Sequence, residues 1–144
     1  MGEADVLLVE DNPGDVRLVQ EAFEGTDVDS RIHVVADGVA ALGFLRGEGE
    51  HADAPTPDIV LLDLNLPRQS GADVLAELGE DPALSHIPVI VLTSSEDTDD
   101  VQRAYDRRAN AYLTKPVDPT AFIELVELVQ EFWLSAARLP SGEA

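Results

Sequence analysis

The chain of 144 residues contains no cysteine, which excludes disulfide bonds, thiolate metal sites and cysteine nucleophiles. It also lacks any run that approaches the roughly 20 apolar residues of a membrane-spanning helix. Its first residues, MGEADVLLVED, have neither the basic start nor the long apolar stretch of a signal peptide. We therefore expect a soluble cytoplasmic protein without a membrane partner.

Basic side chains are scarce as well, with 9 Lys and Arg against 29 Asp and Glu and a formal net charge of −20. This charge repels nucleic acid and anionic lipid surfaces, so we expect no direct nucleic-acid binding. All the basic residues are arginine except Lys115, the only lysine. Because salt at about 1 M screens charges within about 3 Å, the composition favours an extreme halophile of the archaeal kind. An ordinary acidic cytosolic protein is the alternative.

Short apolar segments alternate with helical signals along the chain. VLLV, IVLL and VIVL are apolar without alternation, which is typical of strands covered on both faces. Asn12 before Pro13 and Asp118 before Pro119 indicate helix starts, each with a capping residue followed by proline at the first helical position. Since parallel strands require crossovers, this alternation predicts an α/β domain with a parallel sheet.

The predicted strands cover 4–9, 32–36, 59–62, 89–92 and 111–113, and the predicted helices cover about 13–25, 38–46, 71–79, 97–108 and a last segment from 119. The segment 46–57, rich in glycine, proline and charge, is predicted to be a surface loop. We expect one domain over 1–137 and a tail over 138–144.

Polar residues follow the predicted strands where each ends: Glu10 and Asp11 after the first, Asp63 after the third, Thr93 at the fourth and Lys115 after the fifth. In a parallel sheet these positions share one edge, where ligands bind. Clustered carboxylates need a cation, and ligands that are all oxygen suit Mg²⁺. The Lys115 ammonium, a compact point charge, can neutralise a phosphoryl oxygen. The Thr93 hydroxyl can donate a hydrogen bond to a second phosphoryl oxygen. Asp63 beside Mg²⁺ is a competent nucleophile toward phosphorus.

Four motifs, VEDNPGD, LLDLNLPRQSG, VLTSS and YLTKP, together resemble the receiver domain of two-component response regulators over about residues 4 to 135. The opening motif and the long loop before the third strand are similar to stand-alone receivers paired with phytochrome-type sensor kinases. The resemblance implies a flavodoxin-like α/β fold with a parallel five-stranded sheet in the order 2-1-3-4-5 and helices on both faces.

The resemblance also implies roles for single residues. Asp63 would accept a phosphoryl group from a histidine kinase, and Mg²⁺ would be held by Glu10, Asp11, Asp63 and the backbone carbonyl of Asn65. Thr93 and Lys115 would contact the phosphoryl group. The bond from Lys115 to Pro116 would be cis and would aim the lysine inward.

A switch follows from the same resemblance. Movement of Thr93 toward the phosphoryl group would let Tyr112 swing inward and remodel the face made by the fourth helix, fifth strand and fifth helix, which a downstream protein would read. Ser94 departs from the family, where a small residue such as alanine is more usual. Receivers catalyse only their own phosphoryl uptake and loss, so we expect no turnover enzyme.

The last helix carries an apolar stripe predicted to pack on the sheet: Phe122, Leu125, Val126, Val129, Phe132, Trp133 and Ala136. Ile123, Leu128 and Leu134 lie off this stripe, and the helix is longer than a strand requires. Our hypothesis is that its outer face and C-terminal end form a homodimer contact.

Other interpretations use the same residues. Asp63 could serve a phosphatase of the haloacid-dehalogenase type, although Asn65 stands where that chemistry uses a second aspartate. A phosphorelay intermediate or phosphate sink would need the same site. Each residue alone also has a structural explanation, such as helix capping by Asn12 or core packing by Tyr112. His33, His51 and His86 form no ligand pattern.

Overall fold

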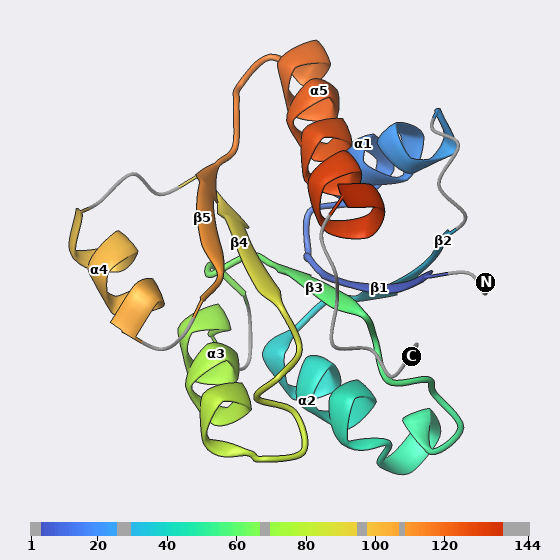
Figure 1. Ribbon diagram of the computed structural model, residues 1–144, viewed down its shortest axis with the longest axis vertical. Coiled ribbons are helices and arrows are strands. Elements are labelled where there is room, and N and C mark those ends of the chain that lie inside the picture. The colour runs from blue at the N-terminus through green and yellow to red at the C-terminus, as the bar shows by residue number, and fades with distance from the viewer. Residues whose placement is uncertain (1–3, 26–29, 67–69, 95–97, 107–108, 137–144) are drawn as a thin grey trace.

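The computed structural model describes residues 4–25, 30–66, 70–94, 98–106 and 109–136. Five strands form one sheet in the order β2-β1-β3-β4-β5, and each neighbouring pair is parallel (Figure 1). This order confirms the predicted fold class. The strands are β1 (Ala4–Val9), β2 (Ser30–Val35), β3 (Ile59–Leu62), β4 (Val89–Thr93) and β5 (Ala111–Thr114).

Helices connect the strands and cover both faces of the sheet. The α-helices are α1 (Pro13–Glu24), α2 (Gly38–Arg46), α3 (Gly71–Glu80), α4 (Thr98–Asp106) and α5 (Pro119–Gln130). In Figure 1, α1 and α5 lie on one face, and α2 and α3 lie on the other. The chain also forms a short 3₁₀ turn, η1 (Gly49–His51), and a π-helical segment, η2 (Glu131–Ala136), that continues α5.

Successive residues of the inner strands alternate between two apolar clusters, which explains why their sequences do not alternate with polar residues. Leu7 and Val9 pack with α2 and α3, whereas Val6 and Leu8 pack with α1 and α5. All four side chains are buried. Truncating a buried leucine to alanine typically costs about 2–5 kcal/mol, so both clusters hold the strand ends in place.

The predicted helix caps are present and fix where α1 and α5 begin. Asn12 Oδ1 accepts from the amides of Gly14 and Asp15 at 2.9 and 3.2 Å. Asp118 Oδ2 accepts from the Ala121 amide at 2.9 Å. Because only three residues separate the end of β1 from the start of α1, the first turn of α1 lies at the edge of the sheet where the polar residues gather.

Most predicted boundaries agree with the structure within one or two residues, and the differences have physical causes. β2 begins at Ser30, two residues earlier than predicted, because this edge strand starts with polar residues that an apolar pattern does not detect. The predicted loop 46–57 contains η1. Residues 107–108 and 137–144 lie outside the described part, so the predicted end of the domain at 137 stays a prediction.

The stripe predicted for the last helix is partly wrong. Phe122, Val126 and Val129 are buried as predicted, but Phe132 is 57% exposed. Ile123, predicted to lie off the stripe, packs against the core on the α1 and α5 face. Phe132 lies at the start of the π-helical segment η2, whose wider turn departs from α-helical spacing, whereas Trp133 in the same segment still packs against the core. In the described part of the chain, no helix combines the length and apolar character needed to cross a membrane.

Candidate functional site

The carboxyl ends of four strands bring five predicted site residues to one edge of the sheet. The register sets Val9 level with Leu62 and Thr93 level with Thr114, so the residues that follow β1, β3 and β5 emerge together. Carboxylate oxygens of Glu10, Asp11 and Asp63 lie within 4.8 Å of one another. Glu10, Asp63 and Thr93 are buried, and Asp11 is exposed.

Lys115 joins the cluster through its ammonium group. Nζ donates to Glu10 Oε1 at 2.6 Å, to Asp15 Oδ2 at 2.8 Å and to Asp63 Oδ2 at 2.9 Å. The side chain is only 10% exposed. The three N–H donors of the ammonium therefore have three carboxylate partners, and these come from three different parts of the chain.

Burial and charge change the protonation of this cluster. Burial raises the pKa of Glu10 to about 7, and the charge of Asp63 adds to the increase. The hydrogen bonds from Lys115 and from the Asn12 amide oppose it. For Lys115, burial lowers the pKa, but the hydrogen bonds to Asp15, Glu10 and Asp63 outweigh burial and leave the pKa above its usual range. Lys115 is thus a permanent cation facing an excess of carboxylates.

The family model of the response regulator receiver domain matches residues 6–127, most of the chain. The chain belongs to the response regulator receiver family. Receiver domains are phosphorylated by histidine kinases, and the cluster at the strand ends agrees with that chemistry. The receiver fold and the family predicted from the four motifs are therefore confirmed.

Named relatives resemble this receiver over nearly its whole length. It is 43% identical to the response regulator Rcp1 of Synechocystis sp., covering 95% of this chain and 93% of Rcp1. It is 42% identical to the probable methanogenesis regulatory protein FilR2 of Methanothrix harundinacea, covering 94% of this chain and 86% of FilR2. A solved structure of the phosphorylated cyanobacterial phytochrome response regulator RcpA matches with a TM-score of 0.95 and 46% identity, covering 97% and 100% of the two chains. The Mn²⁺-bound form of Rcp1 matches with a TM-score of 0.92 and 42% identity, covering 95% and 99%.

The donor set of the receiver fits a hard divalent cation. Glu10, Asp11 and Asp63 offer only oxygen ligands, which Mg²⁺ and Mn²⁺ accept. Lys115 contacts three carboxylates, and Asp11 adds a fourth negative charge beside Glu10 and Asp63, so a bound divalent cation would reduce the local repulsion. The acidic pocket that receivers use for metal is therefore present.

Asn65 links the metal side of the site to Thr93. The backbone amide of Asn65 donates to Asp63 Oδ1 at 3.0 Å, which orients that carboxylate. Its side-chain Nδ2 lies 3.5 Å from Thr93 Oγ1. Asn65 is therefore tied to the site by its side chain as well as its backbone, whereas the sequence prediction used only its carbonyl. The haloacid-dehalogenase interpretation, already weakened by this asparagine, is not favoured by the family match.

Asp15 is a site residue that the sequence prediction missed. An acidic residue in the first turn of a helix already has an ordinary explanation, because it interacts favourably with the helix dipole. The missed signal was positional: the Asn12 cap starts α1 directly after β1, so the first turn of α1 lies above the strand ends.

The predicted cis bond before Pro116 is wrong for this structure. No cis peptide bond occurs in the part of the chain that the structure describes, which includes Lys115 and Pro116. The trans form of an X–Pro bond is favoured by about 0.5–1 kcal/mol. The lysine amide donates to Thr93 O at 2.8 Å. Since this hydrogen bond fixes the backbone at Lys115, its side chain reaches the carboxylates without a cis bond.

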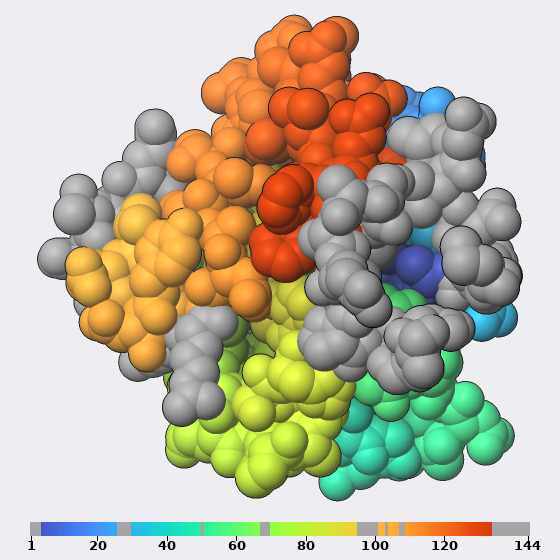
Figure 2. All heavy atoms as spheres, viewed as in Figure 1, coloured from blue at the N-terminus to red at the C-terminus, as the bar shows by residue number. Residues whose placement is uncertain are grey.

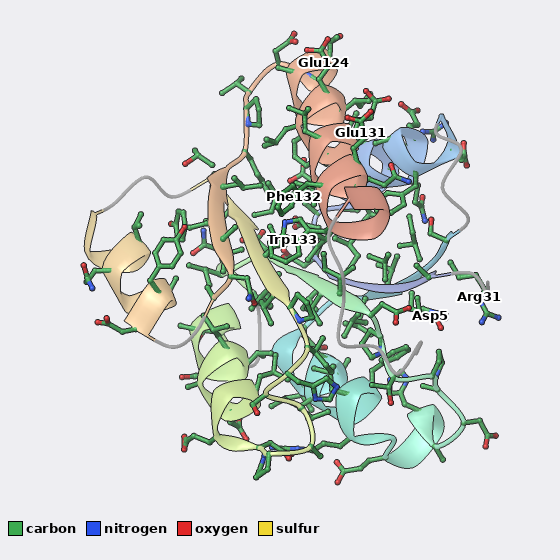
Figure 3. The ribbon with its side chains drawn as sticks, in the orientation of Figure 1. Asp5, Arg31, Glu124, Glu131, Phe132 and Trp133 are labelled. Carbon is green, nitrogen blue, oxygen red and sulfur yellow. The ribbon has the colours of Figure 1, made fainter. Side chains whose placement is uncertain are left out.

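The three histidines are not members of the acidic group at the strand ends. His33 Nε2 lies 3.0 Å from Asp5 Oδ1, and its ring is 5.2 Å from the ring of Phe44. Figure 3 shows Asp5 beside Arg31 at the amino-terminal ends of β1 and β2, where Arg31 Nε lies 3.4 Å from Asp5 Oδ1. His86 is exposed. His33 therefore has a structural role, and His86 is solvated.

Proposed function

We propose that this receiver is a phosphorylation-controlled signalling switch that accepts a phosphoryl group from a histidine kinase on Asp63. The observation that carries the proposal is the 2.9 Å contact between Lys115 Nζ and Asp63 Oδ2 inside a cluster of carboxylates. A cation paired with a buried carboxylate can neutralise a phosphoryl oxygen once that carboxylate has become an acyl phosphate, a mixed anhydride.

The proposed reaction uses Mg²⁺ held by Glu10, Asp11, Asp63 and the backbone carbonyl of Asn65. When bound, the cation would neutralise charge on the transferring phosphoryl group. An Asp63 carboxylate oxygen forms the new O–P bond while the bond between phosphorus and the kinase imidazole nitrogen breaks, and the imidazole recovers a proton. The Mn²⁺-bound structure of Rcp1 supports a divalent cation at such a site.

Thr93 and Tyr112 are the proposed switch. The Thr93 side chain is fully buried beside Asn65, so a phosphoryl group on Asp63 offers its hydroxyl a new acceptor. Tyr112, half-buried on β5, packs against the core on the α2 and α3 face. Its backbone amide donates to Tyr105 Oη on α4 at 3.2 Å. A change at Tyr112 would therefore reach the face of α4, β5 and α5, which we propose a downstream protein binds.

We propose that the sensor kinase is of the phytochrome type. The likeness to Rcp1 and to the phytochrome response regulator RcpA supports an input from a phytochrome-type kinase. FilR2 has nearly the same identity and carries the name of a methanogenesis regulator. Phosphotransfer from a purified phytochrome-type kinase to Asp63 would test this input.

A homodimer through the end of the last helix is a further part of the proposal. Leu128 and Phe132 are 62% and 57% exposed, and the Phe132 ring meets Trp133 edge to face at 5.3 Å. Figure 3 places Phe132 and Trp133 next to each other at this end, and Figure 2 shows the last helical turns at the surface. Light scattering of the wild type and Leu128→Glu would test this; a wild-type monomer at every concentration and salt level would exclude the dimer.

The experiment for the function itself is a mass measurement. The protein, incubated with Mg²⁺ and a small acyl phosphate at high salt, should gain one phosphoryl group. Asp63→Asn should gain none, and removal of Mg²⁺ should abolish the gain for the wild type. Asp58→Asn is a matched control, because Asp58 precedes β3 and accepts the Asp5 amide at 2.8 Å, at the opposite end of that strand. An unlabelled wild type under all salt conditions would refute the proposal.

A further inference from the structure

Among the three carboxylates that contact Lys115, Asp15 differs in origin. Glu10 and Asp63 follow strands β1 and β3 and belong to the group able to hold a metal ion. Asp15 belongs to the first turn of α1 and is not in that group. Its Oδ2 nevertheless lies 2.8 Å from Lys115 Nζ, between the distances of the other two.

The three hydrogen bonds have different prospects during phosphorylation. A cation bound to Glu10 and Asp63 would compete with Lys115 for the negative charge of these two carboxylates, which would weaken their hydrogen bonds to the ammonium. Asp15 would keep its contact, since it lies outside the metal group. One donor of the ammonium would remain tied to α1 while the others become available to the phosphoryl oxygens.

Asp15 is itself held in place by the start of α1. Its amide donates to Asn12 Oδ1 at 3.2 Å, and its side chain is 24% exposed. The helix cap thus fixes the backbone that carries the carboxylate, and the carboxylate fixes the end of a long, flexible side chain. Lys115 lies 100 residues further along the chain, so without Asp15 its position would depend on Glu10 and Asp63, which also belong to the group able to hold a metal ion.

We infer that Asp15 is a positioning residue that holds Lys115 Nζ over Asp63 while the phosphoryl group arrives. The inference rests on the proposed function for its role in phosphotransfer. Asp15 makes no contact with the phosphoryl group in this scheme; it acts through the lysine alone. Its effect should therefore disappear when the lysine is absent.

The first test measures phosphorylation by a small acyl phosphate at saturating Mg²⁺, which removes any effect of Asp15 on metal affinity. We expect Asp15→Ala to slow labelling about tenfold or more, because hydrogen bonds to charged groups are the stronger ones. Asp15→Asn, which keeps an oxygen acceptor, should recover part of the rate. In a Lys115→Ala background, Asp15→Ala should change nothing further, whereas a merely structural role would reduce the rate again.

Asp73→Ala is the matched control. Asp73 is also an acidic residue in the first turn of a helix, α3, where its amide is capped by Ser70 Oγ at 3.2 Å, but its side chain is exposed. It should label like the wild type. Wild-type rates in Asp15→Ala, or equal losses in both lysine backgrounds, would overturn the inference.

The second test does not depend on phosphorylation. Because Lys115 is the only lysine, acylation by an amine-reactive ester, located by peptide mapping, reports on this side chain alone once the N-terminal amine is separated. In metal-free protein, Asp15→Ala should be acylated several-fold faster than the wild type and Asp73→Ala, because one of the three carboxylates that confine the ammonium is gone. Unchanged acylation would overturn the inference. The two proposals can also fail separately. If Asp15→Ala is acylated faster but the wild type never gains a phosphoryl group, the proposed function is refuted and the positioning contact remains established.

Discussion

The backbone of Gly71, at the start of α3, lies directly against the carbonyl group of Asp63. A Cβ atom built at Gly71 would overlap the Asp63 carbonyl oxygen and would lie 2.6 Å from Leu64 Cα. The Gly71 amide donates to Leu64 O at 3.1 Å. The loop that carries Asp63 is therefore clamped to α3 by backbone alone, and only glycine leaves room for it.

We expect Gly71→Ala to destabilise the fold by about 1–3 kcal/mol or more, as overpacking does, and to displace Asp63. Denaturant unfolding would measure the loss. Gly43→Ala is the control, because a Cβ there meets only His51 Cδ2, at 3.5 Å, inside helix α2. That change should stabilise by about 0.5–1 kcal/mol, since alanine is the better helix former. Equal stability of the two variants would contradict the clamp.

The metal-free receiver should lose stability as pH rises toward neutrality. The pKa of Glu10 is about 7 in the folded chain against 4.5 as the ordinary value, so the folded state holds the extra proton between these values. This contribution is complete below pH 4.5 and is lost as pH rises through 7. Thermal unfolding between pH 5 and 8, with EDTA present, should show a steeper fall for the wild type than for Glu10→Gln. Identical pH profiles would show that burial does not raise this pKa.

Tyr105 should protect the amide of Tyr112 from exchange with solvent. The hydroxyl of Tyr105 accepts this amide at 3.2 Å, on the outer side of β5, which is the edge strand of the sheet that the described residues form. Tyr105→Phe removes the acceptor, so exchange at Tyr112 should accelerate, while exchange at Leu113 stays unchanged. Amide hydrogen exchange followed by NMR would measure both. Unchanged exchange at Tyr112 would mean that the hydrogen bond does not hold α4 to β5.

Salt should stabilise the fold because the net charge of −20 repels itself. We expect the melting temperature to rise between 0.1 M and 2 M KCl. Most of this gain should be lost in a variant in which exposed Asp and Glu residues are replaced by Asn and Gln. Differential scanning calorimetry of both proteins would check this. A melting temperature indifferent to salt would remove the halophile interpretation.

The sequence by itself determined the elements and most of the site. Continuous apolar runs such as IVLL require burial on both faces, and the caps Asn12 and Asp118 satisfy amides that a helix start leaves unpaired, so these signals are local and readable. Glu10, Asp63 and Lys115 were predictable because parallel strands end at one edge.

Only the tertiary structure decided how those residues meet. The third partner of Lys115, Asp15, depends on the packing of α1 on the sheet, which sets the first turn of the helix above the strand ends. The exposure of Phe132 depends on how the end of the last helix packs and on the wider turn of η2. Local propensity fixes the backbone of each element, but contacts between residues 100 positions apart, such as Asp15 and Lys115, follow from packing of the whole chain.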